Sequence, residues 1–270
     1  MEYLTLNTGI KIPIIGSGTN TFGKENRDYM GEINHDTKEL LVAIALGYRH
    51  FDTAIAYRNE AVVGQAIKQS GIAREEFFIT SKIPGKAEYT NSAHAVEQAV
   101  QESLWALGTK DSIDLYLIHH PWENLEEMLA VWRVLESFVD NGVLKAIGVS
   151  NFTEKELGFL VEHARIQPAV NQIESHPGKW NQALIDYTKQ QGIVPEAWGP
   201  LTRVSEEAKS ILTTIGEKYG KTWAQVILRY QIEQGVIVIP KSHQPERQAQ
   251  NLEIFDFALT KEERAKIGQL

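Results

Sequence analysis

Four side chains that could act together in acid–base chemistry follow separate apolar runs of the chain. The stretch HFDTAIAYRNE, residues 50–60, carries Asp52 and Tyr57, and two later runs end in Lys82 and His119. A phenol has an ordinary pKa of about 10 and is a poor acid at neutral pH. An ammonium about 4 Å away would stabilise the phenolate by up to about 4 kcal/mol at an effective dielectric of about 20, and Asp52 would keep that ammonium charged.

These residues are suited to the reduction of a carbonyl group. Tyr57 would give a proton to the carbonyl oxygen while His119 orients that oxygen. No side chain can supply the hydride that the carbonyl carbon needs, so we expect nicotinamide as its source.

A second cluster of polar residues lies near the C-terminus. The segment IPKSHQPERQAQN, residues 239–251, places Lys241, Ser242 and Arg247 around a short helix whose first turn contains Pro245. Phosphate groups often bind at a helix N-terminus after the last strands of an α/β barrel. Two cations and a hydroxyl suit a 2′-phosphate, so the segment predicts NADPH rather than NADH. Away from a strand end, the same segment would be interpreted as a solvated basic turn.

The elements that position these residues form a regular series. Strand candidates alternate with helical patterns such as those at 91–108, 124–142 and 222–235, which favours a parallel sheet in an α/β fold. The strand candidates are residues 14–18, 49–52, 77–82, 113–119, 144–151, 169–172, 193–198 and 236–241. The G-x-G-x-x-G turn of an open doubly wound sheet is absent, so we predict one closed (β/α)8 TIM barrel over residues 1–270. Residues 3–6 and 10–15 predict an N-terminal β-hairpin.

In such a barrel the C-terminal ends of the strands meet at one mouth. From the second strand onward, nearly every candidate ends in a polar or aromatic residue, which is why the four acid–base residues are expected to converge. A lone Asp beside a Lys would more often be a buried ion pair, and a lone His a core residue. The coincidence over consecutive strands favours an active site.

Composition excludes several classes of function. The 270 residues contain no cysteine, which rules out disulfides, thiol nucleophiles and cysteine-ligated metal sites. A net charge of −8 argues against unaided binding to nucleic acid or to an anionic membrane. Gly9 and Pro13 interrupt the N-terminus, which does not resemble a signal peptide, and no apolar run approaches the roughly 20 residues of a membrane span. We expect a cytoplasmic protein.

With these residues in place, the sequence resembles the aldo-keto reductase family, and within it the small prokaryotic reductases of the 2,5-diketogluconate and methylglyoxal type. The blocks GYRHFDTAIAYRNEAVVGQAI, FFITSK, DLYLIHHP, KAIGVSNF, VNQIESHP, EAWGPL and IPKSHQPERQAQN occur in family order. The resemblance implies a monomeric enzyme that reduces small aldehydes, dicarbonyls or keto-sugars with NADPH. It implies a catalytic tetrad of Asp52, Tyr57, Lys82 and His119.

The resemblance also implies the binding residues. The cofactor would contact Thr19, Asn20, Asp52, Ser150, Asn151, Gln172, Trp198, Gly199, Leu201, Lys241, Ser242, Arg247, Gln250 and Asn251. Ser150, Asn151 and Gln172 would hold the carboxamide, and Trp198 would stack on the nicotinamide ring. The substrate would contact His119, Asn20, His120 and Trp122.

The chain departs from the family pattern in four places. Asn20 stands where a Trp is frequent, and a polar insertion at 23–36 follows it. His120 stands where a Trp commonly follows the catalytic His, and Trp198 stands where many members have Tyr. The sequence ends at Leu270, whereas many relatives continue into a tail over the substrate, so we expect an open pocket.

Three alternatives use the same residues. Lys82 could form a Schiff base in a barrel lyase, or the chain could bind NADPH as a sensor without catalysis. A metal site from His119, His120 and Glu123 has poor ligand spacing, so we expect no metal.

Two further expectations concern histidines and tryptophans. Neighbouring strand residues point to opposite faces, so we expect only His119, not His120, to enter the mouth. Trp105, Trp132 and Trp223 are expected in the core, whereas His35, His94 and His163 are expected to be solvated or structural.

Overall fold

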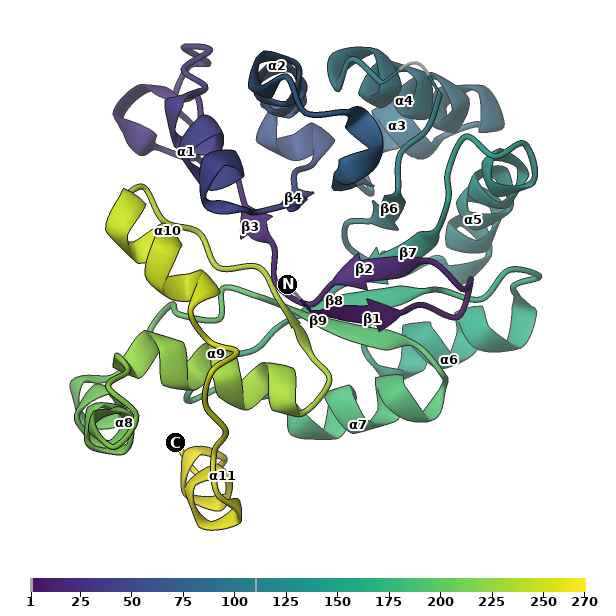
Figure 1. Ribbon diagram of the computed structural model, residues 1–270. Coiled ribbons are helices and arrows are strands. Elements are labelled where there is room, and N and C mark those ends of the chain that lie inside the picture. The colour runs from purple at the N-terminus through teal and green to yellow at the C-terminus, as the bar shows by residue number, and fades with distance from the viewer. Residues whose placement is uncertain (1, 110) are drawn as a thin grey trace.

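The protein is a barrel of eight parallel strands with helices around its outside (Figure 1). The computed structural model describes residues 2–109 and 111–270. The strands are β3 (Ser17–Gly18), β4 (His50–Asp52), β5 (Phe78–Ile83), β6 (Leu115–Ile118), β7 (Ile147–Ser150), β8 (Val170–Glu174), β9 (Val194–Trp198) and β10 (Ile237–Val238). Each predicted strand candidate overlaps one of these strands, although β5 and β8 extend beyond the candidates 77–82 and 169–172.

The sheet closes between its first and last strands. Strands β3 to β10 pair in chain order. Just before β3, Ile15 forms a parallel bridge with Val238, and the Gly16 amide donates to the Val238 carbonyl at 2.9 Å. The closed (β/α)8 barrel is therefore confirmed.

The predicted N-terminal hairpin is also confirmed. Strands β1 (Tyr3–Thr5) and β2 (Lys11–Pro13) pair antiparallel. The Asn7 amide donates to the Pro168 carbonyl, two residues before β8 begins, so the hairpin covers the N-terminal end of the barrel. That end is opposite the strand ends that carry the polar residues.

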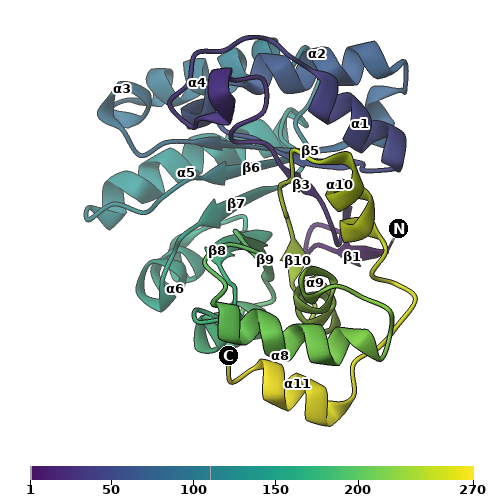
Figure 2. The ribbon, with the colours of Figure 1, turned by 90° about the vertical axis from the view of Figure 1, so that its left-hand side faces the viewer.

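The helices follow the predicted apolar patterns. They are α1 (Lys38–Leu46), α2 (Glu60–Ser70), α3 (Ala87–Thr90), α4 (Ala93–Ala106), α5 (Leu125–Asp140), α6 (Glu154–His163), α7 (Gln182–Gln190), α8 (Glu206–Glu217), α9 (Trp223–Glu233), α10 (Pro245–Leu252) and α11 (Lys261–Ile267). Figure 2 shows α8 and α11 beside each other at one side of the barrel. No helix within the described ranges is both long and apolar enough to cross a bilayer.

The expectation for the tryptophans is wrong in one case. Trp132 is fully buried in α5, and Trp223 is partly buried against the smaller core cluster beneath α8 and α9. Trp105, however, is 85% exposed. Helix α4 turns Leu104 toward the core, and the next residue is rotated by about 100° around the helix axis. The side chains of His35, His94 and His163 are exposed, as expected.

Candidate active site

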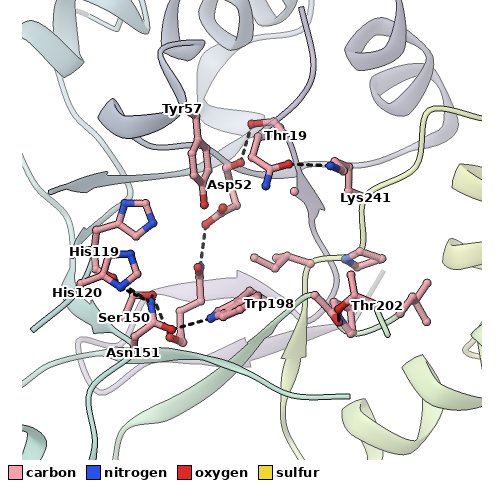
Figure 3. A pocket seen from close by; sticks show the side chains of 18 residues that line it. Thr19, Asp52, Tyr57, His119, His120, Ser150, Asn151, Trp198, Thr202 and Lys241 are labelled. Atoms are coloured by element: carbon pink, nitrogen blue, oxygen red, sulfur yellow. Dashed lines mark hydrogen bonds between the residues drawn. The ribbon is translucent and has the colours of Figure 1, made fainter. Parts of the chain in front are cut away.

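The C-terminal ends of the strands surround a cavity of about 380 Å³. In Figure 3, Tyr57 and Asp52 lie on one side of it, and Ser150, Asn151 and Trp198 lie across from them. The sequence-predicted residues that line the cavity are Thr19, Asn20, Asp52, Tyr57, His119, His120, Ser150, Asn151, Gln172, Trp198, Gly199, Leu201 and Lys241. The lining residues that the sequence did not single out are Gly18, Pro200, Thr202, Ile239 and Pro240.

The loop after β4 bends back and carries Tyr57 over the cavity. Tyr57 ends a short 3-10 turn, and Arg58 then has a φ of 62°, in the left-handed region, which reverses the chain. Asn59 fixes this reversal, because its side-chain amide donates to the carbonyls of Thr19 at 2.7 Å and Phe22 at 3.1 Å. The tyrosine is thus held by buried hydrogen bonds to the loop that follows β3.

Lys82, at the C-terminal part of β5, connects the acid and the phenol. Its fully buried ammonium donates to Asp52 Oδ1 at 2.7 Å, to the Thr53 carbonyl at 3.0 Å and to Tyr57 Oη at 3.3 Å. Burial opposes the charged form, but Asp52 and Tyr57 outweigh burial and raise the pKa of Lys82. The lysine is therefore a fixed cation behind the phenol.

The net pKa of Tyr57 differs from the sequence-based expectation. Burial raises the pKa of Tyr57, and Lys82 only partly offsets that rise. The reason is that the cost of an ionised phenol in this environment exceeds its attraction to the ammonium. The hydroxyl accordingly keeps its proton at neutral pH, which is the state that a proton donor requires.

Both histidines enter the cavity, so the expectation that only His119 would do so is wrong. Strand β6 ends at Ile118, and the alternation of side chains ends with it. The two imidazole rings stack with centroids 4.6 Å apart and planes 9° from parallel. The His119 ring also lies edge-on to Tyr57, with centroids 5.5 Å apart.

His119 is neutral over the working pH range. Burial and the charge of Lys82 lower the pKa of His119 to about 2. Its Nδ1 is buried without a hydrogen-bond partner among the described residues. An unpaired buried acceptor is less costly than an unpaired buried donor, so the proton belongs on Nε2. His119 can therefore donate a hydrogen bond to a carbonyl oxygen in the cavity.

A pH dependence follows from this neutral state. We expect kcat/KM for carbonyl reduction to show no fall between pH 7 and pH 5 that arises from His119, because its charged form appears only near pH 2. The measurement is a pH profile of the wild type beside His119→Gln. An acid limb near the ordinary histidine pKa that disappears in the variant would contradict the neutral assignment.

The wall across from Tyr57 is organised by Asn151, which follows β7. Its Oδ1 accepts from Trp198 Nε1 at 2.8 Å. Because an indole nitrogen can only donate, this bond fixes the amide, and Nδ2 donates to His120 Nδ1 at 3.1 Å. The indole of Trp198 is therefore held in place, and His120 carries its proton on Nε2.

Below the cavity, Gln172 lies between two acids. Its Nε2 donates to Asp52 Oδ2 at 2.8 Å and to Glu196 Oε1 at 2.5 Å. Glu196 is fully buried in β9, and the sequence analysis did not single it out. An acid within the otherwise apolar and aromatic strand candidate at 193–198 was the available signal.

The insertion at 23–36 packs against the loop that carries Tyr57. The Tyr29 ring lies edge-on to Tyr57, with centroids 5.9 Å apart. The Tyr29 carbonyl accepts from Lys24 Nζ at 2.6 Å and from Arg58 at 3.1 Å, and Arg58 also donates to the Gly31 carbonyl at 3.1 Å. This insertion therefore supports the tyrosine from outside the barrel.

Several predicted contacts lie away from the cavity lining. Trp122 packs its ring against Gly85 in the loop after β5, and Lys82 is covered by Asp52 and Tyr57. Five predicted cofactor contacts follow β10. Of these five, Lys241 lines the cavity, and its Nζ donates to Asn20 Oδ1 at 2.8 Å. The other four lie outside the lining and are Ser242, Arg247, Gln250 and Asn251.

The side chains considered for a metal do not form a site. Within residues 2–109 and 111–270, no three His, Cys, Asp or Glu side chains come close enough together to hold an ion. His120 Nδ1 instead accepts a hydrogen bond from Asn151.

Comparison with known proteins agrees with this geometry. The model of the Aldo/keto reductase family matches residues 14–270. The chain belongs to the aldo/keto reductase family. Among curated relatives of this family, a glyoxal reductase of Bacillus subtilis is 42% identical over 270 residues, which is 100% of this chain and 92% of the relative. A methylglyoxal reductase of Yersinia pestis is 38% identical over 230 residues, covering 84% of this chain and 81% of the relative.

Solved aldo/keto reductase structures share the fold. An aldo/keto reductase from Brucella melitensis superposes with a TM-score of 0.89 at 37% identity, over 98% of each chain. A Bombyx mori aldo-keto reductase solved in complex with NADP superposes with a TM-score of 0.87 at 35% identity, over 99% of this chain and 92% of that one.

The alternative of a Schiff-base lyase is disfavoured by the state of Lys82. A nucleophilic amine must be deprotonated, and such lysines have lowered pKa values. Here the ammonium donates three hydrogen bonds and its pKa is raised. The lyase hypothesis would be supported only if borohydride trapped a substrate covalently on Lys82.

Proposed function

We propose that this aldo/keto reductase reduces small aldehydes and dicarbonyls to alcohols with NADPH, and that Tyr57 is the proton donor. The observation that carries the proposal is the contact of Tyr57 Oη with Lys82 Nζ at 3.3 Å, where Tyr57 and the neutral His119 line one cavity and Lys82 lies behind the phenol. The glyoxal and methylglyoxal reductases among the relatives support small dicarbonyls as substrates.

The residues of the chain would act on the carbonyl oxygen. His119 Nε2 and Tyr57 Oη would both donate to that oxygen and so fix the orientation of the carbonyl group. As negative charge develops on the oxygen, Tyr57 would transfer its proton, and Lys82 would stabilise the phenolate that remains. Asp52 keeps Lys82 charged and aimed at the phenol.

The cavity has features that fit a nicotinamide dinucleotide. Bound NADPH would supply the hydride that the carbonyl carbon accepts. The indole of Trp198 offers a flat face, held by its bond to Asn151, and the polar groups of Ser150, Asn151 and Gln172 border the same space and suit a carboxamide. Lys241 provides a cation at the cavity.

The remaining predicted contacts extend this proposal. The loop that contains Gly199 and Leu201 would lie along the pyrophosphate, and Thr19 and Asn20 would contact the cofactor from the side of β3. The 2′-phosphate end would meet Lys241 and the residues on and before α10, which are Ser242, Arg247, Gln250 and Asn251. His120 and Trp122 would contact the substrate.

The contact of Lys241 with a 2′-phosphate gives a testable preference. Lys241→Met is expected to raise the KM for NADPH by about ten- to a hundredfold, because a charge-assisted hydrogen bond is lost. The KM for NADH, which has no 2′-phosphate, is expected to change by less than about twofold. Steady-state kinetics with both cofactors measure this, with Lys11→Met in the distant hairpin as the matched control. Equal losses for NADPH and NADH would contradict the assignment.

The overall activity is tested by the absorbance of NADPH at 340 nm. We expect purified enzyme to oxidise NADPH in the presence of methylglyoxal or phenylglyoxal, and chromatography to identify the corresponding hydroxy-carbonyl product. Absence of turnover over a panel of aldehydes and dicarbonyls would contradict the proposal. Tight NADPH binding without any turnover would instead indicate the sensor.

We also infer a single-domain monomer that acts in the cytoplasm and binds neither nucleic acid nor membrane. The main core cluster runs from the hairpin through every barrel strand that contributes apolar side chains, which supports one domain over residues 1–270. The acidic composition opposes binding to polyanions. Sedimentation or size-exclusion measurements test the monomer.

A further inference from the structure

A buried acid beneath the cavity has no place in the proposed reaction. Glu196 lies in β9 in register with Gln172 of β8, so the two side chains are neighbours across the strands. Both are inside the barrel, with Glu196 fully buried and Gln172 only 2% exposed. Burying a carboxyl group costs free energy. Glu196 is connected to Asp52 through the side chain of Gln172.

The hydrogen bonds determine how the amide of Gln172 points. Its Nε2 lies between Asp52 Oδ2 at 2.8 Å and Glu196 Oε1 at 2.5 Å, and both of those oxygens accept. The end of the Gln172 amide that lies between two accepting oxygens must be its NH2 group, because the amide oxygen cannot donate. Oε1 of Gln172 then accepts no hydrogen bond from a described residue, while Gln172 itself borders the cavity.

Asp52 alone would not fix this arrangement. An NH2 group has two N–H donors, and Asp52 satisfies one of them. Without Glu196 the second donor would remain buried and unpaired, and a single hydrogen bond to Asp52 would hold the amide. Glu196 thus supplies the second acceptor that keeps the amide from being displaced.

We propose that Glu196 is a positioning residue of the active site, which together with Asp52 holds the Gln172 amide so that its oxygen is offered to the cavity. The ligand group that this oxygen suits is an amide N–H donor, such as the carboxamide of nicotinamide. The inference rests on the proposed function, because it assigns Gln172 to the nicotinamide end of NADPH.

The charge of Glu196 is part of this role. Burial, with a further contribution from Asp52, raises the pKa of Glu196 to about 8. The groups that face it are His50 and Asp52 on β4, Lys82 on β5 and Gln172 on β8, and its register neighbour on β10, Ile237, is apolar. Burial lowers the pKa of His50 to about 4, so that ring is neutral and provides no cation. At neutral pH Glu196 is therefore protonated. Its proton lies on Oε2, which has no hydrogen-bond partner among the described residues, so Oε1 still accepts from Gln172. The site gains a negative charge beside Asp52 only in alkaline solution.

Ligand binding without turnover tests the positioning role. Glu196→Met keeps the volume of the side chain but removes the acceptor, whereas Glu196→Gln imitates the protonated acid. At pH 6.5 we expect the methionine variant to bind NADPH about tenfold more weakly than wild type. We expect its affinity for adenosine 2′,5′-bisphosphate, which has no nicotinamide, to stay within about twofold. The glutamine variant should bind both ligands as wild type does.

Two results of the binding experiment would overturn the inference. One is wild-type NADPH affinity in Glu196→Met. The other is an equal loss for both ligands, because that would indicate a general change of structure rather than a misplaced amide. Neither result depends on turnover, so this test can fail while the 340 nm assay succeeds, and the reverse also holds.

A pH profile provides a second readout that a purely structural role would not move. Above pH 8 the ionised Glu196 and Asp52 repel each other across the Gln172 amide. This repulsion should displace the amide, so the wild type should lose NADPH affinity and kcat, while Glu196→Gln should keep both through the same interval. Tyr57 does not cause this difference, because its raised pKa is common to both proteins. Identical alkaline limbs in the two proteins would contradict the proposal.

Stability should follow the same ionisation. The pKa of Glu196 is raised by folding from 4.5 to about 8, so the stabilising contribution of its proton is complete below pH 4.5 and is lost as the pH rises to about 8. Urea midpoints at pH 5.5 and pH 8 should therefore differ more in wild type than in Glu196→Gln. Equal differences would show that Glu196 does not bind its proton as inferred.

Discussion

Replacing Tyr57 with phenylalanine is expected to lower kcat for carbonyl reduction by about 10²–10⁴-fold, the range that a positioned general acid contributes. The ring and its contact with Tyr29 are kept, and only the hydroxyl that meets Lys82 is removed. The dissociation constant for NADPH should stay within about twofold, because the phenol is assigned to the carbonyl oxygen. Steady-state assays at 340 nm and a fluorescence titration with NADPH measure the two quantities.

A matched substitution separates this effect from the loss of any tyrosine hydroxyl. Tyr3 lies in the hairpin at the opposite end of the barrel and is 52% exposed, so Tyr3→Phe should retain full activity. Full activity in Tyr57→Phe would show that another group protonates the product.

Replacing Lys82 with methionine is expected to damage both activity and stability. The ammonium is fully buried and is the cation next to Asp52, so its removal leaves a buried carboxylate without a counter-charge. Breaking a buried pair in this way costs about 3–5 kcal/mol. The kcat should also fall by at least about a hundredfold, because no cation would then stabilise the phenolate. Urea unfolding and the 340 nm assay measure the two losses.

A double variant distinguishes the two effects of Lys82. Adding Asp52→Asn to Lys82→Met removes the uncompensated charge, so it should restore part of the free energy of unfolding but none of the activity. Lys209→Met breaks an ion pair with the exposed Glu206, and its effect on stability should not exceed about 1 kcal/mol. If the double variant regained wild-type kcat, the role of Lys82 in stabilising the phenolate would be wrong.

The positions of the acid–base residues could be predicted because they depend on regular geometry. Parallel strands bring their C-terminal ends together, so side chains at the ends of consecutive strands had to share one mouth. Asp52 and Lys82 lie on adjacent strands, and the structure joins them at 2.7 Å. Tyr57 lies beyond the end of its strand, and it reaches the mouth because its loop turns back, which the buried Asn59 makes it do.

Three expectations failed because they depend on details that the sequence pattern does not determine. His120 was assigned away from the cavity by strand alternation, but β6 ends two residues earlier. Trp105 was assigned to the core from a helical pattern whose inward face excludes it. The net pKa of Tyr57 reflects a balance between burial and Lys82, and burial can only be judged once the surrounding atoms are placed.

The role of Glu196 shows a related limit. An acid in the middle of an apolar strand candidate was an unusual feature, but function was expected at the strand ends, so Glu196 was not assigned to the site. Its significance appears only when the register of β8 and β9 brings it beside Gln172. A polar pair at one level of a barrel cannot be recognised from either strand alone.

The structure of a ternary complex with NADP⁺ and a poorly reacting carbonyl ligand would test the central claim most directly. The distance that matters is that from the carbonyl oxygen to Tyr57 Oη. We predict about 3 Å, with His119 Nε2 at a similar distance from the same oxygen. A carbonyl oxygen that lies out of hydrogen-bond reach of Tyr57, or that binds Lys82 instead, would contradict the assignment of Tyr57 as the proton donor.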